Sequence, residues 1–197
     1  MNFKDRKLKL FLNYIEELTE QYDELLNQKK ELLAELEKKA MYDPLTGLFN
    51  RHALIEFLVK EIERIKRERG EKLIVIFLDL DNFKKVNDIY GHKKGDEVLK
   101  EVANLLKAHF RKYDIVARFG GDEFMVIVRN RNKGEIENVL RKLQERIEEI
   151  FKNFEISVSY GIAVAPDDGT DIDKLITLAD RRMYKMKEKH KTKKLDK

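Results

Sequence analysis

The sequence contains no cysteine and no tryptophan, and only two of its 197 residues are proline. Without cysteine, the chain cannot form disulfides, thiolate zinc sites, iron–sulfur clusters or a cysteine nucleophile. This absence favours a reducing compartment, and we expect a cytoplasmic protein. The chain also lacks any run of eighteen apolar residues and any secretory signal pattern, so we expect no membrane-spanning segment within it. Hydrophobic residues make up 42% of the sequence, which is enough for one folded core.

The excess of positive charge is confined to one end of the chain. The formal net charge is +4, yet residues 1–180 carry 32 Lys or Arg against 35 Asp or Glu, whereas residues 181–197 carry nine against two. A basic face spread over a domain is typical of nucleic-acid-binding proteins, and this distribution does not provide one. We therefore expect no nucleic-acid partner. The basic end is interpreted either as a solvated helix terminus or as a contact for phosphates.

Residues 1–41 are predicted to form one long helix, because no proline or glycine occurs before Pro44. Apolar residues recur in alternating steps of three and four, which is the spacing of a coiled-coil seam, and Lys29 alone interrupts them. So narrow a stripe on a polar helix favours pairing with a second copy over packing on the helix's own domain. We therefore expect a homodimer. The seam consists of Leu8, Phe11, Ile15, Leu18, Tyr22, Leu25, Leu32 and Leu36.

A globular domain is predicted over residues 42–191, followed by a short basic tail at 192–197. Pro44 and Gly47 end the long helix, because proline restricts the residue before it and glycine permits a turn. The apolar run 73–78 predicts a strand buried on both faces. Further strands are expected near 115–119, 124–128 and 156–164, and helices at 51–69, 83–89, 135–151, from 173 onward and after the glycine-containing segment 91–96. This alternation predicts an α/β (α+β) fold in which helices flank a mixed central sheet.

Acidic residues cluster at two places where neither a buried strand nor an apolar hairpin needs them for folding. Asp79 and Asp81 end the most apolar strand, and Asp122 and Glu123 stand in the turn of a predicted hairpin. If the two places are neighbours, Asp79 and Asp122 could form an oxygen-rich site suited to Mg²⁺ or Mn²⁺. The two glycines before Asp122 would also let a nucleotide approach the backbone closely. Because Asp and Gly are ordinary turn residues, these residues alone leave a metal site and a plain turn equally open.

The turn belongs to a series of motifs that extends from Tyr42 to about Lys191. The sequence reads RFGGDEF at 118–124, DPLTGLFNR at 43–51 and DLDNFK at 79–84, with Asn87-Asp88 and the segment 91–96 following. Ser159-Tyr160-Gly161 and the segment 179–184 complete the series. In order and spacing, these motifs resemble those of the GGDEF family, the diguanylate cyclases of bacterial signalling.

The resemblance implies a palm-like nucleotide-cyclase fold with a βαββαβ core, and an enzyme that condenses two GTP molecules into cyclic di-GMP with release of pyrophosphate. It implies two facing subunits that each hold one GTP. Asp122 and Glu123 would be catalytic, and Mg²⁺ (or Mn²⁺) would be bound by Asp79, the Leu80 carbonyl, Asp122 and Glu123. Asn87 and Asp96 would bind guanine. The full set of implied substrate-binding residues is Asn82, Phe83, Lys84, Asn87, His92, Asp96, Lys187 and Lys191, of which His92 is the weakest and only supports the loop in the alternative reading.

Two further segments bear on regulation and on phosphate binding. Arg111-Lys112-Tyr113-Asp114 resembles the RxxD inhibitory site of the family, in which product cyclic di-GMP binds; Arg111 would present a planar fork and Asp114 would accept from guanine. A surface ion pair is the alternative. The chain departs from the family after Tyr184, because His190-Lys191-Thr192 stands where the family usually has Gly-Arg-Asn. At position 191 the compact ammonium group of lysine therefore replaces the planar, forked guanidinium group of arginine.

Three functions are compatible with the sequence. The leading hypothesis is an active, dimeric diguanylate cyclase that is inhibited by its product and controlled through the coiled coil. A non-catalytic receptor for GTP or cyclic di-GMP is the second, although such receptors normally have a damaged GGDEF turn and this turn is intact. A dimerisation module is the third, and it leaves both acidic places unexplained.

Overall fold

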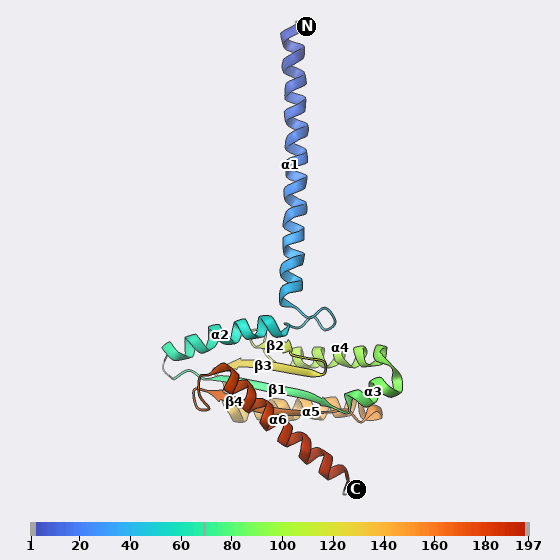
Figure 1. The fold of residues 1–197 in the computed structure, drawn as a ribbon, viewed down its shortest axis with the longest axis vertical. Helices are drawn as coiled ribbons and strands as arrows, with labels where there is room; N and C mark the ends of the chain where they lie inside the picture. Colours follow the sequence, from blue (N-terminus) through green and yellow to red (C-terminus); the bar gives the residue numbers. More distant parts are fainter. Residues whose placement is uncertain (1–2, 69, 196–197) are drawn as a thin grey trace. The chain divides into compact units, whose positions relative to one another are not determined.

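The structure, a computed structural model, describes residues 3–68 and 70–195 (Figure 1). It divides into two compact units, residues 1–40 and residues 41–197. The described part of the first unit lies in α1 (Phe3–Met41), a single continuous helix, as the absence of proline and glycine predicts; only its last residue, Met41, is assigned to the second unit. Its seam side chains from Phe11 to Leu36 are exposed, and the side chain of Leu8 lies outside the described residues. None of the helices described combines the length and apolarity needed to cross a lipid bilayer.

The second unit is built on a four-stranded sheet with the order β2-β3-β1-β4. Its strands are β1 (Leu73–Asp81), β2 (Ile115–Arg118), β3 (Glu123–Arg129) and β4 (Ser157–Ala165). The expected α/β class is confirmed, but the strands pair antiparallel and not in a mixed arrangement. The helical connection from β1 to β2 makes these two strands run in the same direction, and so does the connection from β3 to β4. In each case one other strand lies between the two in the sheet, so that strands that are direct neighbours run in opposite directions.

Helices cover both faces of the sheet. One hydrophobic core lies under α4 (His92–His109) and α5 (Lys133–Ile150), and the other lies under α2 (Arg51–Arg67) and α6 (Ile172–Leu195). In Figure 1, α6 crosses the near face of the sheet and α5 lies behind it. All nine residues of β1 are buried, which confirms the prediction from its continuous apolar run. A short helix, α3 (Phe83–Tyr90), joins β1 to α4, and a 3₁₀ turn (Lys152–Phe154) joins α5 to β4.

Candidate active site

The acidic end of β1 and the acidic hairpin turn are neighbours, which meets the condition that the sequence analysis set for a shared site. Asp79 lies directly opposite Glu123 in the β1–β3 pairing, and the Leu80 amide donates to the Asp122 carbonyl at 3.3 Å. Side chains directly opposite each other on antiparallel strands share one face, about 5 Å apart, and two like charges there repel. Asp79 is only 8% exposed. The fold therefore concentrates negative charge at one edge of the sheet.

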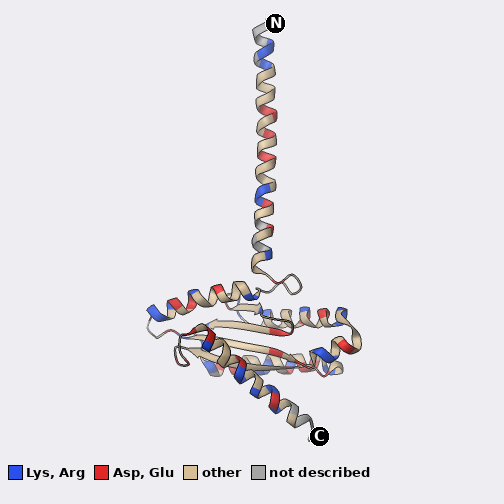
Figure 2. Ribbon diagram, viewed as in Figure 1, with Lys and Arg blue, Asp and Glu red and all other residues tan. Residues whose placement is uncertain are grey.

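Lys187 of α6 compensates part of this charge, since its ammonium group donates to Asp79 Oδ1. Burial raises the pKa of Asp79, and the nearby Asp122 and Asp81 raise it further against the effect of Lys187. Burial, together with Asp79 and Asp122, likewise raises the pKa of Glu123. Although burial opposes the charged form of Lys187, its bond to Asp79 raises the pKa of Lys187 above its ordinary value. Figure 2 shows acidic residues on β1 and at the start of β3, and basic residues along α6.

These carboxylates match the donor chemistry of Mg²⁺ or Mn²⁺, because both ions prefer hard oxygen ligands and would relieve the repulsion. Asp79, Asp122 and Glu123 are the side chains that could hold such an ion, together with the Leu80 carbonyl. Across residues 3–68 and 70–195, however, no three acidic or histidine side chains converge into a ready-made metal cluster. Lys187 occupies the position beside Asp79 instead.

A cavity of about 360 Å³ adjoins the acidic turn. It brings the side chains predicted for guanine binding together with Asp122 of the turn and with Lys84 at the start of α3. At Gly95, beside Asp96, an added Cβ would overlap the Asn87 amide oxygen, so glycine lets α4 pack on Asn87. At Gly121 an added Cβ would meet no atom within 4 Å, and the turn is therefore open at this point. The cavity is lined by Phe83, Lys84, Asn87, His92, Asp96, Leu99, Arg118, Gly121 and Asp122.

The sequence interpretation assigned no role to Arg118, which fixes the turn in place. Its Nε and Nη2 atoms donate to the Gly121 carbonyl at 3.1 and 2.8 Å, and its Nη1 atom lies 3.3 Å from both carboxylate oxygens of Asp43. Asp43 also accepts from the amide and hydroxyl of Thr46. Burial raises the pKa of Asp43, but the hydrogen bonds from Thr46 and Arg118 outweigh burial and hold this pKa below its ordinary value. Arg118 thus ties the 43–47 turn to the acidic hairpin.

Asp81 is engaged in a separate network that the sequence interpretation also missed. Its carboxylate accepts from the hydroxyls of Ser157 and Ser159 on β4, and it lies 3.1 Å from His190 Nδ1 on α6. Asp81 and Asp79 are alternate residues of one strand, so both point to the face that α6 covers. The two aspartates therefore have different partners on the same helix.

Some predicted substrate residues are placed differently from the others. Asn82 has a left-handed backbone (φ 65°), its side-chain amide donates to the Glu155 carbonyl, and it is not among the residues that line the cavity. Such strain in a non-glycine residue persists only where the surrounding structure imposes it, often at functional sites. Lys187 contacts Asp79 and does not line the cavity. Lys191 lies in α6, and its side chain lies outside the described residues.

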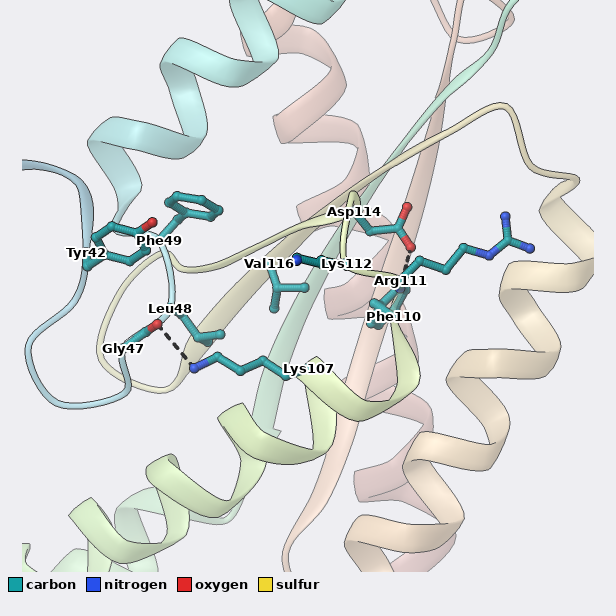
Figure 3. Close-up of a pocket in the computed structure, with 10 residues that line it drawn as sticks. All are labelled: Tyr42, Gly47, Leu48, Phe49, Lys107, Phe110, Arg111, Lys112, Asp114 and Val116. Atoms are coloured by element: carbon teal, nitrogen blue, oxygen red, sulfur yellow. Dashed lines mark hydrogen bonds between the residues drawn. The ribbon is translucent and has the colours of Figure 1, made fainter. Parts of the chain in front are cut away.

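The RxxD segment lies elsewhere, between α4 and β2, beside a cavity of about 410 Å³ (Figure 3). Asp114 is 6% exposed; one carboxylate oxygen accepts from the Arg111 amide at 2.8 Å, and the other has no hydrogen-bond partner within the described chain. Burial raises the pKa of Asp114 despite the nearby arginines. The Arg111 guanidinium donates to the Tyr113 hydroxyl at 2.6 Å and, in Figure 3, extends away from Lys107 and Gly47. In the described chain the two charged groups form no ion pair, which disfavours the surface ion-pair alternative.

Comparisons with known proteins show which family this chain resembles over most of its length. The family described as diguanylate cyclase, GGDEF domain, matches residues 40–193. The diguanylate cyclase DgcS of Shewanella oneidensis is 40% identical over 159 residues, which cover 78% of this chain and 51% of DgcS. The cyclic di-GMP phosphodiesterase NbdA of Pseudomonas aeruginosa is 37% identical over 167 residues, which cover 83% of this chain and 21% of NbdA.

A microbial GGDEF domain solved with cyclic di-GMP is similar in structure, with a TM-score of 0.69 and 31% identity over 78% of this chain and 94% of that one. The chain spans about a fifth to a half of the length of the two curated relatives. The family match, by contrast, covers most of this chain and includes every motif of the series from 43 to 184. The chain therefore belongs to the GGDEF family of diguanylate cyclase domains.

Proposed function

We propose that this chain is a diguanylate cyclase, which condenses two GTP molecules into cyclic di-GMP and releases pyrophosphate. The observation that carries the proposal is the single cavity in which Asn87 and Asp96 lie together with Asp122 of the acidic turn. Asn87 and Asp96 offer hydrogen bonds to the edge of a guanine base, and a base without matching groups would leave them unpaired. The similarity to the cyclase DgcS supports the same reaction.

In the proposed reaction, the 3′-oxygen of each GTP attacks the α-phosphate of the other, so that two phosphodiester bonds form and two pyrophosphates leave. Such phosphoryl transfers depend mainly on positioning and on charge stabilisation. Lys84 at the cavity and Lys187 beside Asp79 would bind triphosphate oxygens, together with the first amides of α3, which the left-handed Asn82 orients. A bound Mg²⁺ or Mn²⁺ would supply further positive charge. Either Asp122 or Glu123 would accept the single 3′-hydroxyl proton, and the raised pKa of Glu123 suits Glu123 to this role.

Because the product joins two nucleotides and the described residues of one domain provide one such cavity, the proposed reaction brings two domains face to face. The exposed apolar seam of α1, from Phe11 to Leu36, fits a parallel coiled coil with a second copy. Pairing would hold two half-sites at a high effective concentration and replace a slow encounter between separate domains. We therefore propose a homodimer joined through α1.

Incubation of the chain with GTP and Mg²⁺, followed by chromatography of the nucleotides, tests the proposed reaction. We expect cyclic di-GMP and pyrophosphate to accumulate in a ratio of one to two, at a rate per subunit that rises with protein concentration until dimers are complete. Binding of GTP without conversion at any protein concentration would contradict the reaction and favour a receptor. A melting temperature that GTP and Mg²⁺ leave unchanged would favour a dimerisation module.

Product inhibition is proposed to act through Arg111 and Asp114, and Arg111→Ala tests it. We expect half-inhibition of the variant to need about tenfold more cyclic di-GMP than the wild type, because one forked, charge-assisted contact is lost. Initial rates at increasing cyclic di-GMP measure the effect. Lys100→Ala, which removes an exposed charge from α4, is the matched control. Equal inhibition of Arg111→Ala and the control would exclude this segment as the inhibitory site.

A further inference from the structure

His190 occupies a position on α6 at which it contacts the second aspartate of β1. Its Nδ1 atom lies 3.1 Å from Asp81 Oδ2 and 3.2 Å from the Ser159 hydroxyl. Asp81 is 7% exposed and Ser159 is fully buried, so the contact lies within the packed interface of α6 with the sheet. Neither the sequence motifs nor the proposed reaction gives His190 a role.

The direction of these hydrogen bonds follows from the groups involved. An ionised aspartate only accepts, whereas each serine hydroxyl has one proton to donate. The hydroxyls of Ser157 and Ser159 both donate to Asp81, at 2.9 and 2.8 Å. His190 must therefore donate from Nδ1 to Asp81, and its other ring nitrogen, Nε2, takes no part in this network. Asp81 thus holds α6 through the histidine and β4 through the two serines.

Lys187 and His190 attach α6 to β1 at two points. They are three residues apart on one face of the helix, and they contact Asp79 and Asp81, which are two residues apart on one face of the strand. In the proposed reaction, Lys187 must exchange Asp79 for a phosphate oxygen. The His190 contact is separate from that exchange, because Asp81 is bonded to Ser157, Ser159 and His190 and not to Lys187.

We propose that His190 is a positioning residue, which fastens the C-terminal half of α6 to Asp81 so that Lys187 stays aligned with the triphosphate after it leaves Asp79. The proposal rests on the proposed function, since it takes a GTP phosphate as the second partner of Lys187. His190 itself touches neither the nucleotide nor the reacting atoms.

The test measures binding of 3′-deoxy-GTP with Mg²⁺ by titration calorimetry, since this nucleotide lacks the attacking oxygen and binds without turnover. We expect His190→Ala to weaken binding about tenfold, because a misaligned Lys187 loses most of a charge-assisted bond. His190→Asn places its amide nitrogen where Nδ1 stands and should restore binding to within about twofold. Lys189→Ala, an exposed neighbour on the same helix, should bind like the wild type.

A double-mutant cycle then tests whether His190 acts through Lys187. In a Lys187→Ala background we expect His190→Ala to have almost no further effect on affinity. Additive losses would overturn the proposal, and so would rescue by His190→Gln but not by His190→Asn, which would indicate direct contact from Nε2. A His190→Ala variant that melts at a lower temperature but binds normally when folded would show a merely structural role and overturn it as well.

The same titration separates this inference from the reaction. A wild-type chain that binds 3′-deoxy-GTP but forms no cyclic di-GMP from GTP would contradict the proposed reaction and leave the positioning role to be judged by the variants. Failure of the wild type to bind 3′-deoxy-GTP would overturn both.

Discussion

Asp79→Asn is expected to lower the rate of cyclic di-GMP formation by at least about a thousandfold while the chain stays folded. Asp79 is buried beside Lys187 and opposite Glu123, at the centre of the acidic edge. An asparagine of the same shape would remove the negative charge that the proposed site needs to hold a divalent ion. The substitution lowers the reaction rate, because a neutral amide ligates Mg²⁺ weakly and can accept a hydrogen bond from the ammonium group but not form an ion pair with it.

The stability of this variant should change little, because two effects of the substitution oppose each other. Removing the charge relieves the repulsion from Glu123 and Asp122, which raises the stability, but it leaves the partly buried Lys187 without its counter-charge, which lowers the stability. Circular dichroism and the melting temperature check the fold, and chromatography of the nucleotides measures the rate. Asp88→Asn, which removes an exposed carboxylate from α3 nine positions further along the chain, is the control. A rate for Asp79→Asn within tenfold of the control would contradict the role of Asp79.

The sequence predicts well those features that depend on residues close together in the chain. The burial of β1 on both faces follows from six consecutive apolar residues, which no surface strand would tolerate. The meeting of Asp79 with the hairpin turn was conditional on the strands being neighbours, and the β1–β3 pairing supplies that condition. The cavity residues from Phe83 to Asp96 lie close together in the chain, so α3 and the start of α4 position them all.

Contacts between distant segments could not be predicted in this way. His190 and Asp81 are 109 residues apart in the chain, and Arg118 and Asp43 are 75 apart. Each pair depends on how α6 or the 43–47 turn packs on the finished sheet, which no local pattern encodes. The antiparallel pairing is a similar case, because strand direction depends on which position each crossover skips, and element order leaves that choice open. The contact of the Asn82 side chain with Glu155 has the same cause, since Glu155 follows the 3₁₀ turn 73 residues further along the chain.

Gly161→Ala is expected to lower the free energy of unfolding by about 3 kcal/mol, at the upper end of the usual cost of overpacking. Gly161 lies on β4 opposite Phe77, on the face that α6 covers. An added Cβ there would overlap the carbonyl oxygen of Ala179 and the amide nitrogen of Met183, both of which are backbone atoms of α6. A rotamer change cannot move backbone atoms away, so the whole helix would have to shift off the sheet.

This shift would also reach the site, because α6 carries both Lys187 and His190 to the end of β1. We expect the melting temperature to fall by about 6–12 °C, since a domain of this size loses roughly 2–4 °C per kcal/mol, and we expect the variant that remains folded to bind 3′-deoxy-GTP more weakly. Gly121→Ala is the matched control for stability: its added Cβ meets open space, so its melting temperature should stay close to that of the wild type. Equal melting temperatures for the two variants would mean that α6 tolerates displacement from β4. The close contact at Gly161 would then not be the feature that holds α6, and with it Lys187, over the acidic edge of the sheet.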